Sequence, residues 1–158
     1  MDSRDIDSML VRRTDPILTS PSHPVDSFDA ELSRIIASMH KVMHQFNGVG
    51  LAAVQIGVPL RLFVVDSGRF QSTFVNPEIL SYGPWYSTSE GCLSIPGESF
   101  HPPRPYSLHL AWLDPEGVEH QQRFDALEAH IISHEMDHLS GILAPDRCAM
   151  GPDQLRTR

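Results

Sequence analysis

The sequence lacks the features that would place the chain in a membrane, outside the cell or on nucleic acid. It has no apolar run of about 18 residues, which a membrane-spanning helix requires. The first ten residues, MDSRDIDSML, lack the basic and then apolar pattern of a secretory signal. Only two cysteines occur, Cys92 and Cys148, too few for a disulfide framework. We therefore expect a cytoplasmic protein without a membrane partner.

Basic residues are also scarce. Lys and Arg number 12 against 20 Asp and Glu, which gives a net charge of −8 and argues against a nucleic-acid partner. The chain of 158 residues is 41% hydrophobic and 20% charged, a composition typical of a folded globular protein. This length supports one core but not two. We expect a single domain over residues 1–158, with residues 1–10 and 150–158 loosely ordered.

Apolar spacing predicts a helix near each end of this domain. Spacings of three and four place one stripe along the first helix, formed by Leu32, Ile35, Ile36, Met39, Met43 and Phe46. We expect Asp26 or Ser27 to cap its start. Asp125 and Glu128 resemble a capping box at the start of the second helix, which runs to Gly141.

Between the helices the sequence is typical of strands. The predicted strands cover residues 60–66, 73–77, 106–113 and 118–124, and the turn sequence DPEG joins the last two. Strands in the middle with a helix at each end predict an α+β fold with antiparallel sheets rather than alternating βαβ units.

The second helix contains the sequence HEMDH. Residues four apart on a helix differ by only about 40° in projection, so His134 and His138 can present both imidazoles to one ion. Glu135 lies where a carboxylate can reach a water on that ion without being a ligand. A bare pair of inward histidines is more often part of an ordinary core, but the glutamate favours a metal site.

The third ligand is less obvious from the residues. No histidine or glutamate follows the helix, which leaves Asp146 and Cys148 as downstream candidates. Upstream, Cys92 lies in EGCLSIP, beside a glycine that permits close approach of the backbone. Spacing does not choose between Cys92 and Cys148.

A glycine-rich stretch, GVGLAAVQIG, follows the first helix. Its start matches the dinucleotide fingerprint G-x-G-x-x-A, but that motif should follow a strand and open a helix, so we reject this interpretation. An exposed backbone edge for an extended peptide is the alternative. Gln55, an amide among apolar residues, could donate to a polarised oxygen.

In order along the chain, GVGLAAVQ, EGCLS and HEMDHLSG resemble the three signature motifs of the peptide deformylases. The resemblance implies an α+β fold in which antiparallel sheets surround a central helix that carries the HExxH motif. It implies removal of the formyl group from N-formylmethionine of nascent polypeptides. It also selects Cys92, His134 and His138 as ligands of one divalent metal, natively Fe(II), with Zn(II) or Ni(II) possible in isolated protein.

The same resemblance implies roles for further residues. The metal makes hydroxide available, Glu135 acts as general base and then acid, and Gln55 with the backbone N–H of Leu93 stabilises the oxyanion. The peptide is expected along Val49 and Gly50. Five residues are implied to line the pocket for the methionine side chain, namely Val49, Thr88, Leu127, His130 and Ile131.

Three positions depart from the family pattern. Ser133 stands where glutamine is usual, His130 where the pocket is more often aliphatic, and Ser99 where many members have a peptide-holding arginine. Arg104 is a candidate partner for Glu90 or Asp137. The tail contains only LRTR in place of a basic C-terminal helix, so we expect no ribosome docking by that route.

Three rival functions remain at this point. A catalytically impaired deformylase-like protein would bind formyl-peptides without cleaving them. A zincin-type endoprotease would not need Cys92. A structural zinc module would need a fourth protein ligand, for which Asp137 or Cys148 would have to serve.

Overall fold

The computed structural model describes residues 9–150 of the chain. Its main element is a five-stranded sheet in the order β1-β2-β3-β8-β9, in which every neighbouring pair is antiparallel. These strands are β1 (Gly50–Ala52), β2 (Leu62–Asp66), β3 (Gln71–Tyr82), β8 (Ser107–Leu113) and β9 (Glu119–Asp125). The predicted α+β class with antiparallel sheets is confirmed.

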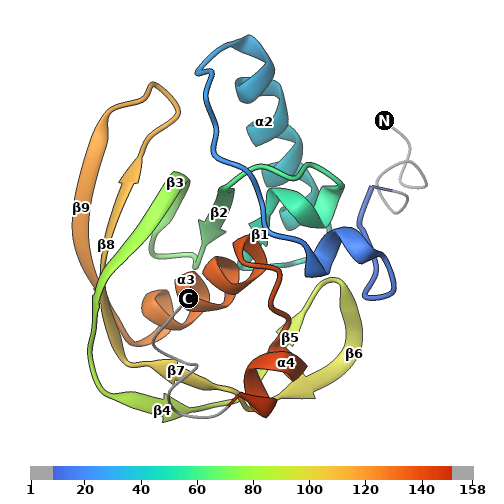
Figure 1. Ribbon diagram of the computed structural model, residues 1–158, viewed down its shortest axis with the longest axis vertical. Helices are drawn as coiled ribbons and strands as arrows, with labels where there is room; N and C mark the ends of the chain where they lie inside the picture. The colour runs from blue at the N-terminus through green and yellow to red at the C-terminus, as the bar shows by residue number, and fades with distance from the viewer. Residues whose placement is uncertain (1–8, 151–158) are drawn as a thin grey trace.

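Two small antiparallel sheets extend this framework. One pairs β4 (Trp85–Ser87) with β7 (Pro103–Pro105), and the other pairs β5 (Glu90–Cys92) with β6 (Ile95–Phe100). In Figure 1, β5 and β6 lie across α3 (Ala126–Leu139) from β8 and β9. The remaining helical segments are η1 (Pro16–Thr19), α2 (Ala30–Gln45), η2 (Ala53–Ile56) and α4 (Ala144–Ala149).

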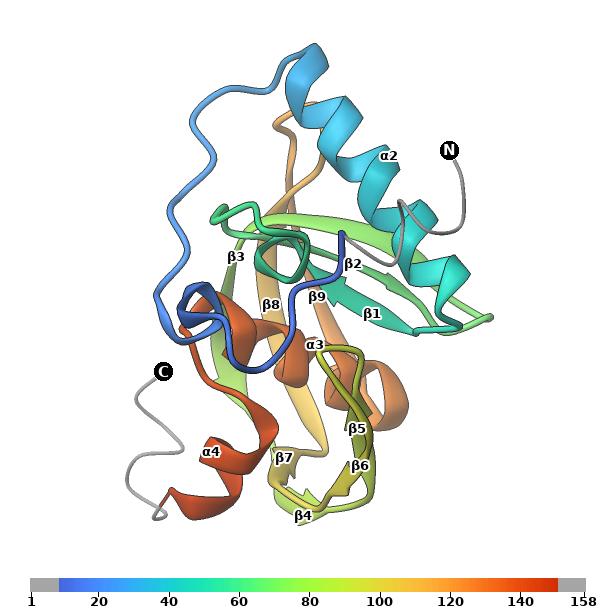
Figure 2. The ribbon, with the colours of Figure 1, turned by 90° about the vertical axis from the view of Figure 1, so that its right-hand side faces the viewer.

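The two long helices cover opposite faces of the sheet, as Figure 2 shows. Side chains of β2 alternate accordingly, because successive residues of a strand point to opposite faces. Leu62 and Val64 join the core cluster beneath α2, whereas Phe63 and Val65 join the cluster that contains the apolar residues of α3. Because both faces of β2 are buried, its sequence is a continuous apolar run.

The central helix α3 is buried along most of its length, including the histidines and the glutamate of HEMDH. A helix enclosed on most sides belongs to the core, so its polar residues need partners inside the protein. Within residues 9–150, no helix is long and apolar enough to cross a bilayer.

Both predicted helix caps differ from the structure. Asp29, rather than Asp26 or Ser27, caps α2, and its Oδ1 accepts from the backbone N–H of Leu32 at 3.0 Å. Asn76 holds the preceding chain extended, because its side chain bonds both the N–H and the carbonyl of Val25. Asp125 does precede α3, but its carboxylate accepts from Arg123 and makes no capping bond.

Strand limits differ where a bulge intervenes. The strand predicted over residues 73–77 is the middle of the longer β3, which continues past Pro77 to Tyr82. The register with β8 shifts between Val75 and Glu78, and Asn76 adopts a positive φ of 48°. A bulge accommodates proline because the irregular position needs no ladder N–H.

The loose order expected at the chain ends concerns mainly residues outside the described part, 1–8 and 151–158. Within the described part, Leu10 is buried in the core cluster beneath α2.

Candidate metal centre and active site

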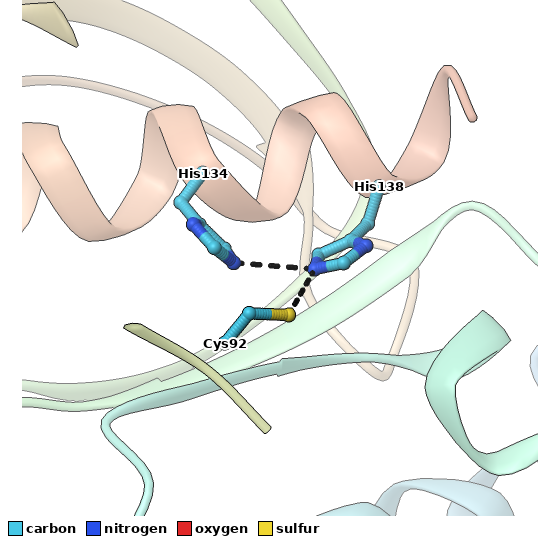
Figure 3. Close-up of side chains that lie close together, drawn as sticks. All are labelled: Cys92, His134 and His138. Atoms are coloured by element: carbon cyan, nitrogen blue, oxygen red, sulfur yellow. Dashed lines mark hydrogen bonds between the residues drawn. The ribbon is translucent and has the colours of Figure 1, made fainter. Parts of the chain in front are cut away.

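Three candidate ligands converge between α3 and the small β5–β6 sheet. His134 and His138 lie one turn apart on α3, and Cys92 is the last residue of β5 (Figure 3). The two Nε2 atoms are 3.2 Å apart, and the Cys92 Sγ is 3.6 Å from His138 Nε2. All three donor atoms lie within 4.8 Å of one another.

These distances fit one tetrahedral ion. With metal–nitrogen bonds of about 2.0–2.1 Å and a metal–sulfur bond of about 2.3 Å, a tetrahedral site separates two nitrogens by about 3.3 Å and nitrogen from sulfur by about 3.6 Å. One thiolate with two imidazoles is a donor set that suits zinc, iron or nickel. The geometry therefore fits the divalent metal that the sequence indicated.

The other candidate ligands are engaged elsewhere. The carboxylate of Asp146 accepts from the backbone N–H of Leu143, and Cys148 is exposed on α4. Asp137 is held by two arginines. Within residues 9–150 the group therefore contains three protein ligands, which leaves a coordination position for solvent or substrate, as a catalytic site requires.

Glu135 lies beside these ligands and is almost completely buried. One carboxylate oxygen is 4.0 Å from His134 Nε2, and the other, Oε2, is buried without a hydrogen bond to the described protein. Burial raises the pKa of Glu135 to about 7, although the nearby His134 opposes the shift. A bound divalent cation would also oppose it. The free oxygen is available to exchange a proton with a ligand in the site.

Gln55, in η2, is held with its amide towards the Cys92 sulfur. Its Oε1 accepts from the backbone N–H of Ala52 at 3.0 Å, which fixes the orientation of the amide. Its Nε2 lies 3.1 Å from Ser94 Oγ and 3.8 Å from Cys92 Sγ. Leu93, the other predicted oxyanion donor, directly follows Cys92 and lines the same cavity.

A buried carboxylate orients the first histidine. Glu90 Oε1 lies 2.8 Å from His134 Nδ1, which leaves Nε2 of that ring for a metal. Glu90 also accepts two hydrogen bonds from Arg104 and pairs with Nε2 of His130. Burial alone raises the pKa of Glu90, but the bonds from His130, His134 and Arg104 outweigh burial and hold it well below its usual value.

Arg104 connects this carboxylate to a second one. Its Nη1 is 2.5 Å from Asp137 Oδ2 and 3.3 Å from Ser133 Oγ, and Arg147 also donates to Asp137. Arg104 was a candidate partner for Glu90 or Asp137, and the structure shows that it binds both. The role of Arg147 could not be foreseen, because no sequence pattern brings α4 against α3.

We expect Arg104→Gln to destabilise the fold by about 3–5 kcal/mol, because the change leaves two buried carboxylates short of a cation. Urea unfolding measures this loss. Arg123→Gln is the matched control: Arg123 pairs with Asp125 on the surface and should cost no more than about 0.5 kcal/mol. Equal small losses of stability in both variants would contradict the inference that Arg104 stabilises the two buried carboxylates.

The ligands border a cavity of about 620 Å³. Five of the six predicted substrate-binding residues line it, namely Val49, Gly50, Leu127, His130 and Ile131. Thr88, the sixth, is not among the lining residues.

Two residues that depart from the family pattern make side-chain contacts in the structure: His130 Nδ1 lies 3.5 Å from the Tyr86 hydroxyl, and Ser99 bonds to Ser89. Sequence reasoning missed Tyr86, which belongs to no motif, and the contact of Ser94, the last residue of EGCLS, with Gln55.

Gly50 lies so close to α3 that a side chain has no room. A Cβ there would lie 2.9 Å from Glu135 Oε1 and 3.0 Å from Ile131 Cγ2. We expect Gly50→Ala to displace the glutamate and to lower kcat/KM by about 100-fold in an activity assay of the metal-loaded protein. Gly91→Ala is the control, because its Cβ would meet no atom closer than 3.8 Å. Equal activity of the two variants would show that the close approach is unimportant.

Comparison with known proteins gives one consistent result. A family model described as "Polypeptide deformylase" matches residues 8–152. The chain is 39% identical over 149 residues to a peptide deformylase of Rhizorhabdus wittichii, with 87% of this chain and 84% of the relative covered. It is 40% identical over 143 residues to one of Mesorhizobium japonicum, covering 87% and 81%.

Solved structures agree. The peptide deformylase from Thermotoga maritima superimposes with a TM-score of 0.86 at 34% identity, covering 90% of this chain and 97% of that one. A peptide deformylase from Synechococcus elongatus, in complex with actinonin, gives a TM-score of 0.85 at 35% identity, covering 92% and 80%.

Proposed function

The chain belongs to the peptide deformylase family and has an intact Cys-His-His metal site, and on this premise we propose how its residues remove the formyl group from N-formylmethionyl peptides. The observation that carries the proposal is that Glu135 lies beside His134 and the Gln55 amide lies beside Cys92. We propose Fe(II) as the native ion and expect Zn(II) or Ni(II) to bind the same donors.

The substrate would bind as an added strand. β1 is the last strand at one side of the main sheet, and both Val49 and Gly50 line the cavity. An extended peptide can pair with such an edge through main-chain hydrogen bonds. The methionine side chain would then contact Leu127, His130 and Ile131. Because Glu90 and Tyr86 occupy the two ring nitrogens of His130, its carbon atoms remain for contact with the thioether.

The chemistry follows from the donors around the formyl carbon. A divalent ion held by Cys92, His134 and His138 would supply Lewis acidity, which lowers the pKa of a water in the site. Glu135 takes a proton from this water through its free oxygen as the water oxygen bonds to the formyl carbon, and it returns the proton to the amine nitrogen as the C–N bond breaks and formate leaves. Gln55 Nε2 and the backbone N–H of Leu93 donate to the formyl oxygen as its charge develops, each contributing about 3 kcal/mol.

The rival functions have less support. The endoprotease alternative does not need Cys92, which lies against the histidines here. The structural zinc alternative needs Asp137 or Cys148, and neither reaches the site. A binding protein without activity does not need the buried, unbonded oxygen of Glu135.

Turnover of formyl-Met-Ala-Ser by the Fe(II)- or Ni(II)-loaded protein tests the proposal. We expect formate and Met-Ala-Ser in repeated turnovers, with the internal peptide bonds intact. Binding of the peptide without formate at high protein concentration would instead favour the catalytically impaired alternative. Cleavage within the peptide would favour the endoprotease.

A further inference from the structure

The segment before η1 is attached to both sides of the cavity. The backbone N–H of Val11 donates to the carbonyl of Gln55 at 2.7 Å, and that of Arg13 donates to the carbonyl of Ser94 at 3.1 Å. One anchor therefore lies on η2 and the other on the turn between β5 and β6. Arg12 stands between the two anchors, so its backbone position is fixed relative to the site.

The Arg12 side chain lines the cavity. Its Nη1 lies 3.4 Å from the carbonyl oxygen of Leu93, next to Cys92. Among the cavity-lining residues of the described chain it is the only lysine or arginine. No carboxylate within residues 9–150 lies within ion-pair distance of it, whereas the neighbouring Arg13 is 3.9 Å from Glu98.

Two carboxylates that line the cavity already have arginine partners, whereas Arg12 does not have a carboxylate partner among the described residues. Glu90 is bonded to Arg104, and Glu98 has Arg13 as its partner. The guanidinium of Arg12 is exposed and has no such partner among the described residues. On a protein of net charge −8, this rim is therefore a local site where a peptide carboxylate is attracted rather than repelled.

We propose that Arg12 is a specificity-determining residue, which binds a carboxylate located downstream of the formylated methionine. This inference rests on the proposed deformylase function. On a nascent chain the carboxylate would belong to an Asp or Glu side chain that follows the methionine. In a short peptide the free C-terminus could supply the same group. Arginine suits this role because its planar fork matches a carboxylate.

The experiment compares isosteric peptides that differ in charge. Formyl-Met-Ala-Glu-amide is compared with formyl-Met-Ala-Gln-amide, and formyl-Met-Glu-Ser-amide with formyl-Met-Gln-Ser-amide. Formyl-Met-Ala-Ser as acid and as amide tests the C-terminal source separately. We expect kcat/KM to favour the acidic member of at least one pair by about 2- to 5-fold at low salt, the range of an exposed ion pair. The preference should decline as ionic strength rises.

Two variants assign the preference to one side chain. Arg12→Gln should reduce the ratio to about 1, and Arg12→Lys should retain part of it. Arg69→Gln removes the same charge from an exposed residue outside the cavity lining and should leave the ratio as in the wild type. An unchanged ratio in Arg12→Gln, including an equal loss on all peptides, would overturn the proposal. So would an equal loss of preference in Arg69→Gln, or no acidic preference in the wild type.

A binding measurement separates this inference from the proposed function. The dissociation constants of the same peptides are measured by calorimetry with metal-loaded Glu135→Gln protein, with and without Arg12→Gln. A preference for the acidic peptide that disappears with Arg12→Gln supports the inference even if the wild type releases no formate. Equal affinities for the paired peptides in this background would overturn it.

Discussion

Glu135→Gln is expected to lower kcat for formate release by about 10²- to 10⁴-fold, the usual contribution of a general acid–base group. The amide keeps the shape of the side chain but cannot accept a proton at the oxygen that lies free beside the ligands. The two histidines and Cys92 are unchanged, so the metal content should remain that of the wild type. Steady-state formate release and metal analysis of the same preparation measure both quantities.

Glu128→Gln is the matched control for this prediction. Glu128 lies in the first turn of the same helix and is bonded to Ser67, away from the three ligands. Its change to glutamine should leave kcat nearly unaltered. If Glu135→Gln retained wild-type kcat with full metal content, the proton transfers would have to be assigned to another group.

Cys92→Ser is expected to weaken metal binding by more than about 100-fold, because even residues that only support a ligand change metal affinity by about 10- to 100-fold. A serine hydroxyl does not ionise readily, so the site would retain two imidazoles and lose its anionic donor. Metal content after dialysis against a weak chelator measures the loss. Formate release should fall in parallel.

The second cysteine provides the control. Cys148 is exposed on α4, and its change to serine should leave the metal content at the wild-type value. Wild-type affinity in Cys92→Ser would contradict the ligand assignment and revive the zincin-type alternative, which does not use Cys92.

The site could be predicted from the sequence where its residues lie close together along the chain. His134 and His138 are four residues apart on one helix, so periodicity alone brings their rings together. Cys92 lies more than 40 residues away, and spacing could not choose it over Cys148; the resemblance to a family did. Its position depends on the packing of the β5–β6 sheet against α3, which no local pattern specifies.

The buried charges were the least predictable part. Arg104 lies 14 residues from Glu90 and 33 from Asp137 along the chain, and the three meet only because β5, β7 and α3 pack together. Ser133 and His130 depart from the family pattern, yet both contact members of this network. The cap at Asp29 was missed for a similar reason, since Asn76 of β3 holds the chain before it.

The central claim is that one ion is shared by a thiolate and two imidazoles and keeps a position for the reaction. A crystal structure of the Ni(II)-loaded protein, with anomalous scattering recorded at the nickel edge, tests it most directly. We predict a single strong peak bonded to Cys92 Sγ and to Nε2 of His134 and His138. A peak at any other group of side chains, or one with a fourth protein ligand, would contradict the account.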